Sequence, residues 1–178
     1  MLSTLNRLAT LEKPVIHRDI KPANVFVKGR ACVLGDFGLM KTIDVEDRLS
    51  PEDVVKTSVG NGMPFFHRTP DLIAYANGEA APTVASDVFQ LGLVAAELFT
   101  GRNPQKRAEH DNFKSRVILE PLRYVPGSRG GMIKTLIHSM LVFDPEKRPA
   151  VADLLDQWRD FFFAIAADQE AFEGRVFS

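Results

Sequence analysis

The stretch His17-Arg18-Asp19-Ile20-Lys21-Pro22-Ala23-Asn24, followed by Asp36-Phe37-Gly38, decides both the fold and the chemistry of this chain. Its polar residues are the types that phosphoryl transfer needs, because that reaction depends on positioning and on neutralising negative charge. A carboxylate must accept or orient the proton of the attacking hydroxyl, and a nearby lysine can neutralise charge on the transferred group. We therefore predict Asp19 and Lys21 as catalytic residues.

Two short runs between these motifs predict a β-hairpin. Residues 25–27 and 31–34 are mostly β-branched, aromatic or otherwise apolar, and Lys-Gly-Arg at residues 28–30 offers a turn between them. A hairpin would bring Asn24 and Asp36, which lie at its two ends, close together. Mg²⁺ prefers oxygen ligands, so we predict these two residues as its ligands. A solvated loop residue is the alternative for each one taken alone, and the joint pattern of the motifs argues against it.

The two motifs resemble the catalytic loop and the magnesium-binding triplet of eukaryotic-type protein kinases. The likeness continues in the family's order over about nine tenths of the chain. It implies that Asp19 is the base, that Lys21 contacts phosphate, and that Asn24 and Asp36 hold the metal. ATP and Mg²⁺ are then the cofactors, bound through Asn24, Asp36 and Lys21, and a protein is the substrate. A lysine two positions after the aspartate is the serine/threonine-kinase form, so serine and threonine are the expected acceptors.

The fold that the resemblance implies is mainly α, a protein-kinase-like C-terminal lobe with a short β-hairpin carrying the catalytic and magnesium-binding loops. We expect the β-rich N-terminal lobe to be absent, because only sixteen residues precede His17 and Gly-x-Gly-x-x-Gly occurs nowhere in the sequence. Residues 1–163 are the expected partial kinase domain, and residues 164–178 a C-terminal tail. Without the phosphate-covering elements, the isolated chain is expected to transfer phosphate poorly or not at all.

A kinase-like binding module or pseudokinase-type decoy without catalysis is the alternative function, and a small-molecule phosphotransferase is a weaker third. The full set of polar catalytic groups favours the enzyme, since a binding module has no chemical need for them. An apolar face centred on Val25, Phe26, Phe37 and the first helix is expected to be exposed, where a missing N-terminal lobe or a partner would pack.

Asp87 is a candidate for the scaffold of the catalytic loop. It precedes the run Val88–Phe99, whose only strongly polar residues are Gln90 and Glu97, and this pattern predicts a helix inside the domain. Asp87 is either an ordinary helix-capping residue or, as the resemblance favours, an acceptor for backbone N–H groups that steadies the catalytic loop.

Arg148 resembles the arginine that pairs with a carboxylate at the end of the family's activation segment, and Asp71 is the matching acid. A surface arginine without a fixed partner is the alternative. Within that segment, a phosphate on Thr57 or Ser58 is expected to make bidentate contacts with Arg18 and so order the segment. An unmodified polar loop is the competing interpretation.

The remaining organisation is predicted to be helical. Apolar residues at helical spacing predict core helices at Met132–Phe143 and Val151–Phe162, with prolines interrupting the helix between them. Leucines every three residues between Leu2 and Leu11 predict the end of an amphipathic helix. The region from Gly101 to Gly131 is rich in charge, Pro and Gly, so we predict loops with one short helix near Phe113–Leu119.

Composition indicates an ordinary globular domain, with 45% apolar residues, 25% charged residues and a net charge of −1. The near-neutral charge argues against nucleic acid as a partner, and the absence of a long apolar run argues against a membrane. The single cysteine, Cys32, lies in an apolar run and is expected to be buried. One cysteine forbids an internal disulfide, which fits a cytoplasmic location.

Overall fold

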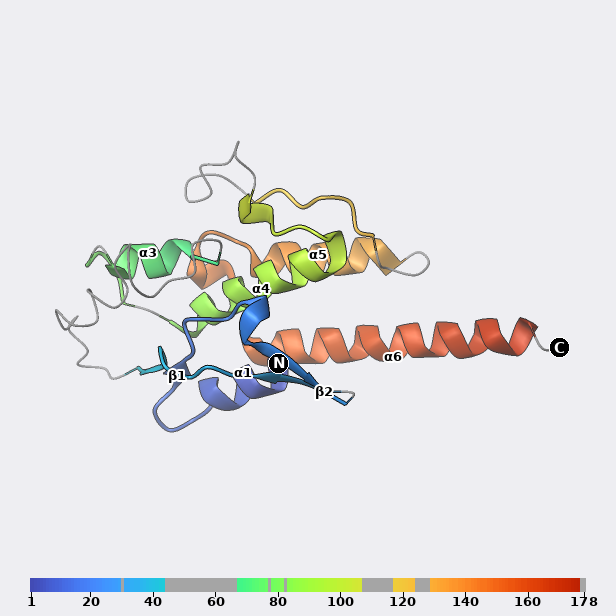
Figure 1. The fold of residues 1–178 in the computed structure, drawn as a ribbon, viewed down its shortest axis with the longest axis horizontal. Coiled ribbons are helices and arrows are strands. Elements are labelled where there is room, and N and C mark those ends of the chain that lie inside the picture. Colours follow the sequence, from blue (N-terminus) through green and yellow to red (C-terminus); the bar gives the residue numbers. More distant parts are fainter. Residues whose placement is uncertain are drawn as a thin grey trace.

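The computed structural model describes residues 1–29, 31–43, 67–76, 78–81, 83–106, 117–123 and 129–176. Over these residues the chain is mainly helical, with α1 (Leu2–Ala9), α3 (Pro70–Ala76), α4 (Val84–Thr100), α5 (Gly130–Met140) and α6 (Val151–Val176). Single turns of 3₁₀-helix lie at η1 (Pro22–Asn24), η2 (Pro104–Lys106) and η4 (Pro145–Lys147). The strands β1 (Val15–Ile16), β2 (Val25–Lys28), β3 (Ala31–Leu34) and β4 (Lys41–Thr42) form two small antiparallel sheets, β1–β4 and β2–β3. Figure 1 shows the order of these elements.

The predicted hairpin is confirmed. Strands β2 and β3 pair antiparallel from Val25 opposite Leu34 to Lys28 opposite Ala31. Gly29 in the turn has φ +62°, a left-handed conformation that glycine adopts at little cost. At the open end of the hairpin, Gly35 N donates to Asn24 O at 2.9 Å. The hairpin therefore ties the end of the first motif to the start of the second.

Helix α4 is the centre of the structure, as Figure 1 shows by its place among the other helices. Every residue from Ser86 to Leu93 is buried. One side of α4 packs with α5 and α6 through a cluster that includes Phe89, Ile137 and Phe161. The other side packs with α1, the hairpin and α6 in a second cluster, whose members include Leu5. The prediction of a helix inside the domain is confirmed for this half of α4.

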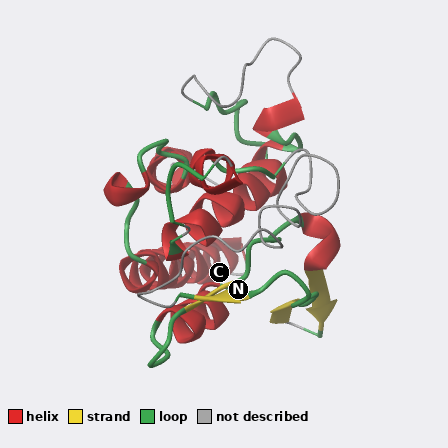
Figure 2. Ribbon diagram, turned by 90° about the vertical axis from the view of Figure 1, so that its left-hand side faces the viewer, coloured by secondary structure: helices red, strands yellow, loops and turns green. Residues whose placement is uncertain are grey.

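The second half of α4 differs from that prediction, since the Leu98 side chain is 67% exposed. The apolar composition of Val88–Phe99 does not distinguish the two halves. Burial on all sides depends on how many neighbours surround the helix, and those neighbours come from distant parts of the chain. Figure 2, turned by 90°, shows the helices grouped together, with one strand among them in this view and others to one side.

The helix boundaries correct the sequence-based ones. Helix α1 ends at Ala9, two residues before the last leucine of its pattern, and α5 begins at Gly130 and ends at Met140. Helix α6 continues to Val176, well past the predicted end at Phe162 and through position 163 without a break. Residues 117–119 are not helical, so the predicted short helix does not include them, and residues 113–116 lie outside the described part of the chain. The boundary between a domain and a tail at residue 163 stays a prediction.

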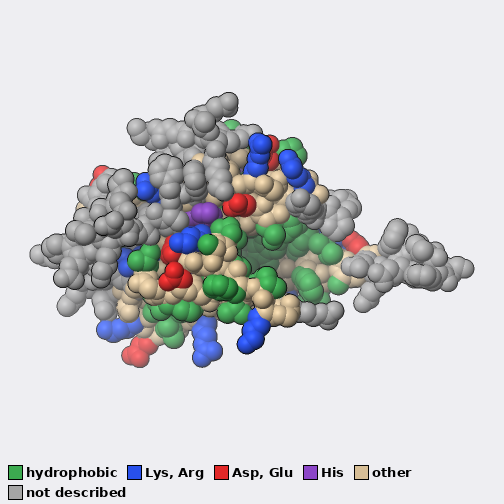
Figure 3. Space-filling view, viewed as in Figure 1, with side chains coloured by type: hydrophobic (Ala, Val, Ile, Leu, Met, Phe, Trp, Pro, Cys, Tyr) green, Lys and Arg blue, Asp and Glu red, His purple; other side chains and the backbone are tan. Residues whose placement is uncertain are grey.

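The outer surface of the hairpin is apolar and uncovered. Phe26, Val27 and Phe37 are 56%, 77% and 48% exposed. Figure 3 shows that hydrophobic side chains reach the surface of the molecule on the face it presents. The prediction of an exposed apolar face is correct for Phe26 and Phe37. It is wrong for Val25, which is half-buried, and for the apolar side of α1, because both pack against the second core cluster.

Cys32 is exposed, contrary to prediction. It lies in β3 opposite Val27, and its strand neighbours Ala31 and Val33 are exposed as well. An apolar run alone does not reveal whether a hairpin is covered on one face or on neither.

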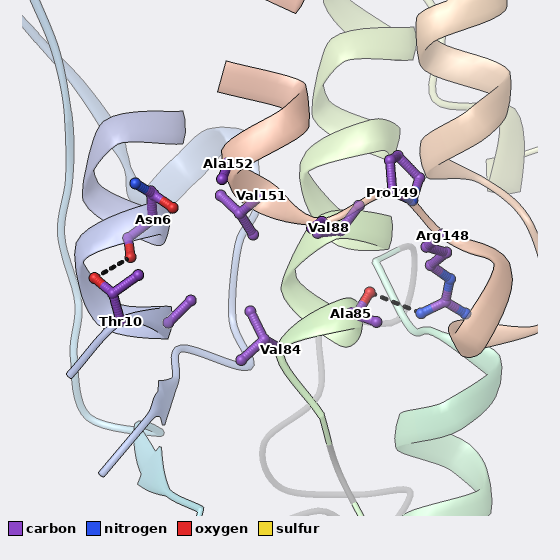
Figure 4. A pocket seen from close by; sticks show the side chains of 11 residues that line it. Asn6, Thr10, Val84, Ala85, Val88, Arg148, Pro149, Val151 and Ala152 are labelled. Carbon is purple, nitrogen blue, oxygen red and sulfur yellow. Dashed lines mark hydrogen bonds between the residues drawn. The ribbon is translucent and has the colours of Figure 1, made fainter. Parts of the chain in front are cut away.

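A hollow of about 340 Å³ lies between α1 and the first turns of α4 and α6. Figure 4 shows its lining, which is mostly apolar and includes Val84, Val88 and Val151. None of the four predicted site residues lines this hollow. In the described part of the chain, no helix has both the length and the hydropathy that a membrane span requires.

Candidate active site

The backbone of the first motif is held by Asp87 on α4. His17 N donates to Asp87 Oδ2 at 2.8 Å, and Arg18 N donates to Asp87 Oδ1 at 2.9 Å. Thr83, not Asp87, occupies the N-cap position of α4. Of the two interpretations of Asp87, the acceptor of backbone N–H groups is therefore correct. Arg18 has φ +67°, an uncommon conformation for a non-glycine residue, and these bonds fix the backbone around it.

Asp87 is almost completely buried, and burial raises its pKa to about 7. Its two hydrogen bonds from His17 N and Arg18 N act in the opposite direction, because they favour the charged carboxylate. The local electrostatics of the loop thus depend on a carboxylate whose protonation changes near neutral pH.

Gln90, one turn farther along α4, also binds the loop, and the sequence did not predict this role. Ile20 N donates to Gln90 Oε1 at 3.0 Å, and Gln90 Nε2 donates to Arg18 O at 2.9 Å and to His67 O at 3.0 Å. A signal was present in the sequence, since Gln90 is a polar residue in an apolar helix. A buried amide must find hydrogen-bond partners. The identity of those partners, which lie 23 to 72 positions away, could not be read from the sequence.

The side chains of Asp19, Lys21 and Asn24 converge. Asp19 Oδ2 lies 2.9 Å from Lys21 Nζ and accepts a hydrogen bond from Asn24 Nδ2 at 2.8 Å. Asn24 Nδ2 also lies 2.9 Å from Asp19 O. The turn of 3₁₀-helix that Pro22 begins brings Asn24 back toward the aspartate.

Asp19 is 3% exposed, and its Oδ1 is buried without a hydrogen-bond partner among the described residues. A buried carboxylate oxygen without a hydrogen-bond partner lowers the stability of the fold, so its presence calls for an explanation such as a catalytic role. Its neighbour Oδ2 is occupied by Lys21 and Asn24. The arrangement therefore leaves one oxygen of Asp19 able to accept a proton or a hydroxyl hydrogen bond.

Asp36 is exposed and follows directly on Gly35, whose amide binds Asn24 O. Its φ is +59°, and its Oδ1 accepts a weak hydrogen bond from Gly38 N at 3.3 Å. The structure thus brings Asn24 and Asp36 to adjacent ends of one hairpin. Among the described residues, no group of three or more His, Cys, Asp and Glu could hold a metal ion. A cation at this hairpin end would have one carboxylate and one amide from the protein and would take its other ligands from phosphate and water.

His17 links the two motifs. Its ring contacts the Phe37 ring edge-on, with 5.3 Å between centroids. Asp19 N donates to His17 Nδ1 at 3.4 Å, so in this tautomer the ring proton is on Nε2. The pKa of His17 is lowered, mainly by burial, although the nearby carboxylates of Asp19 and Asp36 act to raise it. His17 is therefore a neutral, packed residue at pH 7.

The predicted ion pair between Arg148 and Asp71 is present. Arg148 Nη1 lies 2.8 Å from Asp71 Oδ1, and both side chains are buried. Arg148 also donates to three backbone carbonyl groups, those of Ala85 at 2.7 Å, Val142 at 2.7 Å and Phe143 at 2.9 Å. Figure 4 shows its bond to Ala85. Burial lowers the pKa of Arg148 and the facing carboxylate raises it, and the guanidinium stays charged.

Asp71 has a further partner that the sequence did not indicate. The Ser86 hydroxyl, in the first turn of α4, donates to Asp71 Oδ2. Thr69 Oγ1 accepts from Leu72 N at 3.0 Å and so caps the start of α3. Asp71 therefore forms the ion pair with Arg148 and is also bonded to α4.

The predictions for Thr57 and Ser58 lie outside the described residues. Their proposed partner, Arg18, is described: its Nε donates to Leu39 O at 2.6 Å, and its Nη1 is buried without a partner among the described residues. The guanidinium therefore retains a donor, but the predicted contact with a phosphate stays untested.

Comparisons with known proteins agree with the resemblance noted in the sequence. A sequence model of the family described as "Protein kinase domain" matches residues 1–159. The chain is 30% identical over 155 residues to the probable serine/threonine-protein kinase ireA of Dictyostelium discoideum, a match that covers 85% of this chain and 14% of that protein. It is also 30% identical over 162 residues to mitogen-activated protein kinase kinase kinase 4 of Homo sapiens, covering 89% of this chain and 10% of that protein.

A third relative is described as the membrane-associated tyrosine- and threonine-specific cdc2-inhibitory kinase wee-1.3 of Caenorhabditis elegans. It is 34% identical over 144 residues, which cover 80% of this chain and 19% of that protein. The chain thus spans between 10% and 19% of the length of these three relatives. The acceptor named for this third relative includes tyrosine as well as threonine.

Proposed function

The chain belongs to the protein kinase family, and from this premise we propose that it is the catalytic C-terminal lobe of a serine/threonine protein kinase. Its reaction is the transfer of the γ-phosphate of ATP to serine and threonine hydroxyl groups of a protein. The observation that carries the proposal is the convergence of Lys21 and Asn24 on Oδ2 of Asp19, while Oδ1 has no hydrogen-bond partner in the part of the chain that the structure describes.

The proposed mechanism assigns one task to each of these groups. Asp19 Oδ1 accepts the hydrogen bond of the acceptor hydroxyl, orients it, and takes its proton as the new phosphate ester bond forms. Lys21, 2.9 Å from the same carboxylate, places positive charge where negative charge grows on the transferred group. Asn24 holds Asp19 in place through two hydrogen bonds of its side-chain amide.

Asn24 and Asp36 are also the proposed metal ligands. The Asn24 amide nitrogen faces Asp19, so its amide oxygen points to the other side of that group. Asp36 lies just after β3, and β3 pairs with β2, which begins directly after Asn24. The carboxylate of Asp36 is exposed. One amide and one carboxylate oxygen fit Mg²⁺, which takes few ligands from protein when phosphates are present. When bound, Mg²⁺–ATP supplies the phosphoryl group and the neutralisation of its charge.

We further propose that residues 1–178 alone transfer phosphate slowly or not at all. Their sequence contains no Gly-x-Gly-x-x-Gly loop to cover the phosphates. The exposed Phe26 and Phe37 are the proposed contact for an N-terminal lobe or a partner that supplies one. A kinase-like binding module without catalysis remains the second candidate, favoured by that same uncovered face.

The test is Mg²⁺-dependent transfer from labelled ATP to a mixture of Ser, Thr and Tyr peptides. It is performed with the natural gene product that contains these residues and with residues 1–178 alone. We expect the gene product to label Ser and Thr peptides, and Asp19→Asn to reduce the rate at least about a thousandfold. Glu146→Gln, at an exposed site in η4, is the matched control and leaves the rate unchanged.

Two outcomes would contradict the proposal in different ways. Labelling that survives Asp19→Asn would assign the chemistry to another protein. Tyrosine labelling without serine or threonine labelling would overturn the acceptor class while leaving the reaction type intact. Absence of labelling by the gene product, with a partner still bound, would favour the binding module.

A further inference from the structure

We propose that Gln90 is a positioning residue, which fixes the backbone on both sides of Asp19 and joins it to the backbone at His67. This inference rests on the proposed function, because it assigns Gln90 a part in orienting the catalytic base. It stands on the hydrogen bonds and burial of the Gln90 side chain.

The Gln90 amide uses all its donors and one acceptor on backbone groups. Nε2 donates to Arg18 O at 2.9 Å and to His67 O at 3.0 Å, and Oε1 accepts from Ile20 N at 3.0 Å. Arg18 and Ile20 are the two neighbours of Asp19 in the chain. A single fully buried side chain thus binds the residue before the proposed base and the residue after it.

Asp87 cannot replace these contacts. It binds the N–H groups of His17 and Arg18, which both precede Asp19. Packing of the Ile20 side chain in the core holds that residue in place, but hydrophobic contact is non-directional and does not set the orientation of a peptide plane. The hydrogen bond from Ile20 N to Gln90 does set it, and with it the direction in which Asp19 leaves the backbone.

The third contact reaches a different part of the chain. His67 precedes α3, whose start is fixed by the ion pair between Asp71 and Arg148. Next to it, Arg68 O accepts from Gln105 Nε2 at 2.8 Å. Under the proposed function, this segment is the end of the activation segment, beside the protein substrate. The side-chain amide of Gln90 therefore links the backbone at His67, on the proposed substrate side of the site, to the backbone around the proposed base Asp19.

No other residue type of similar size supplies the same three bonds. Glutamate keeps an acceptor for Ile20 N and, when ionised, loses both donors to Arg18 O and His67 O. Methionine fills the space and makes none of them. Comparing these two substitutions therefore distinguishes the effect of the Gln90 acceptor from that of its donors, and neither substitution opens a large cavity.

The experiment uses Gln90→Met and Gln90→Glu in the natural gene product, with Thr100→Val as the matched control. Thr100 is an equally buried polar residue of α4, whose hydroxyl donates to Ala96 O and lies away from the catalytic loop. Peptide phosphorylation gives kcat and the KM for ATP. Amide hydrogen exchange, read by NMR, reports the protection of the Ile20 N–H and, as an internal reference, of the Arg18 N–H.

With Gln90→Met we expect kcat to fall about 10- to 100-fold and the KM for ATP to stay within about twofold, because the misplaced group is the base. Protection of the Ile20 amide falls at least about tenfold, and that of the Arg18 amide, held by Asp87, falls less. Gln90→Glu keeps most of the Ile20 protection and still lowers kcat. Thr100→Val lowers the melting temperature and leaves kcat within about twofold.

The proposal is overturned if Gln90→Met changes kcat no more than Thr100→Val at equal loss of stability, or if the Ile20 and Arg18 amides lose protection equally. If Gln90→Met does not fold, Gln90→Glu decides by the same kcat comparison. If the wild-type gene product transfers no phosphate, the proposed function has failed, and the exchange pattern then tests separately whether Gln90 fixes the loop.

Discussion

At the scale of single residues, the backbone conformation of the catalytic-loop motif depends on the two hydrogen bonds that Asp87 accepts from N–H groups. Asp87→Asn keeps the size of the side chain but turns one acceptor into a donor, which then faces a backbone N–H at His17 or Arg18. We expect the free energy of unfolding to fall by about 1–3 kcal/mol at pH 8, measured by urea denaturation. Asp153→Asn, at an exposed position of α6, is the control and changes it by less than about 0.5 kcal/mol.

His17 gives the site a pH dependence of definite sign. Burial lowers its pKa below the ordinary value of 6.5, so the unfolded chain binds a proton that the folded chain does not. Its contribution to stability is complete above about pH 6.5 and is lost as the pH falls below that value. His17→Asn keeps an acceptor near Asp19 N and does not titrate.

We therefore expect the stability advantage of the wild type over His17→Asn to shrink between pH 7 and pH 5, measured by urea denaturation at each pH. Asp87 titrates in the same range with the opposite slope: its pKa is raised to about 7, so stability falls as the pH rises toward 7. The difference between the two proteins removes the Asp87 contribution. A difference that is constant across this range would show that His17 is not buried in neutral form.

At the scale of elements, the crossing of α4 and α5 requires a residue without a side chain at position 92. A Cβ there would lie 2.9 Å from Met140 Cβ and 3.0 Å from Leu141 Cδ2. We expect Gly92→Ala to lower the free energy of unfolding by about 1–3 kcal/mol in thermal or urea melts, because the helices must move apart. Gly131→Ala in α5, where nothing lies within 4 Å, is the control and should stabilise the chain by up to about 1 kcal/mol.

The connection between α3, α4 and the start of α6 depends on the planar guanidinium of Arg148. Arg148→Lys keeps the charge opposite Asp71 and loses most of the carbonyl contacts, so we expect a loss of about 2–3 kcal/mol in urea denaturation. Arg159→Lys makes the same substitution in an exposed pair with Asp156, and it should cost less than about 0.5 kcal/mol. Equal effects at the two sites would show that the burial of Arg148 contributes nothing.

Local patterns predicted these elements well where the partner is close in sequence. The hairpin follows from two short apolar runs on either side of a glycine turn, and α5 and α6 from helical spacing. The predicted end of α6 at Phe162 is too early. No proline or glycine stands between Phe162 and Gly174, so the sequence there contains no signal that would stop the helix. The extent to which α4 is surrounded was missed because packing partners distant in sequence decide it.

In the candidate site, too, the residues that form a local pattern were predictable and the contacts between distant parts of the chain were not. Asp19, Lys21, Asn24 and Asp36 were chosen from residue type and spacing, and the structure brings the first three into contact. The partners of Gln90 were not predictable, because hydrogen bonds across 23 to 72 positions leave no local pattern in one sequence.

At the scale of the whole molecule, the hairpin departs from an ordinary globular surface because several of its apolar side chains are exposed. Val27 and Phe26 expose more than half of their side chains, and Val33 46%. We expect residues 1–178 alone to bind the dye ANS and to self-associate with rising concentration. Val27→Lys should reduce both without lowering the melting temperature, because Val27 packs against little. Ser3→Lys, on the exposed side of α1, is the matched control for added charge.

The bonds from Asp87 and Gln90 to residues 17–20 span 69 to 72 positions of the chain. During synthesis on a ribosome, the hairpin next to this loop can pair as soon as it emerges, whereas the loop must wait for α4. At about 5–20 residues per second, that wait lasts roughly 4 to 14 seconds. The residues on which the proposed chemistry depends therefore take their shape later than the hairpin beside them, and a nascent chain stalled before Gln90 carries the motif without its geometry.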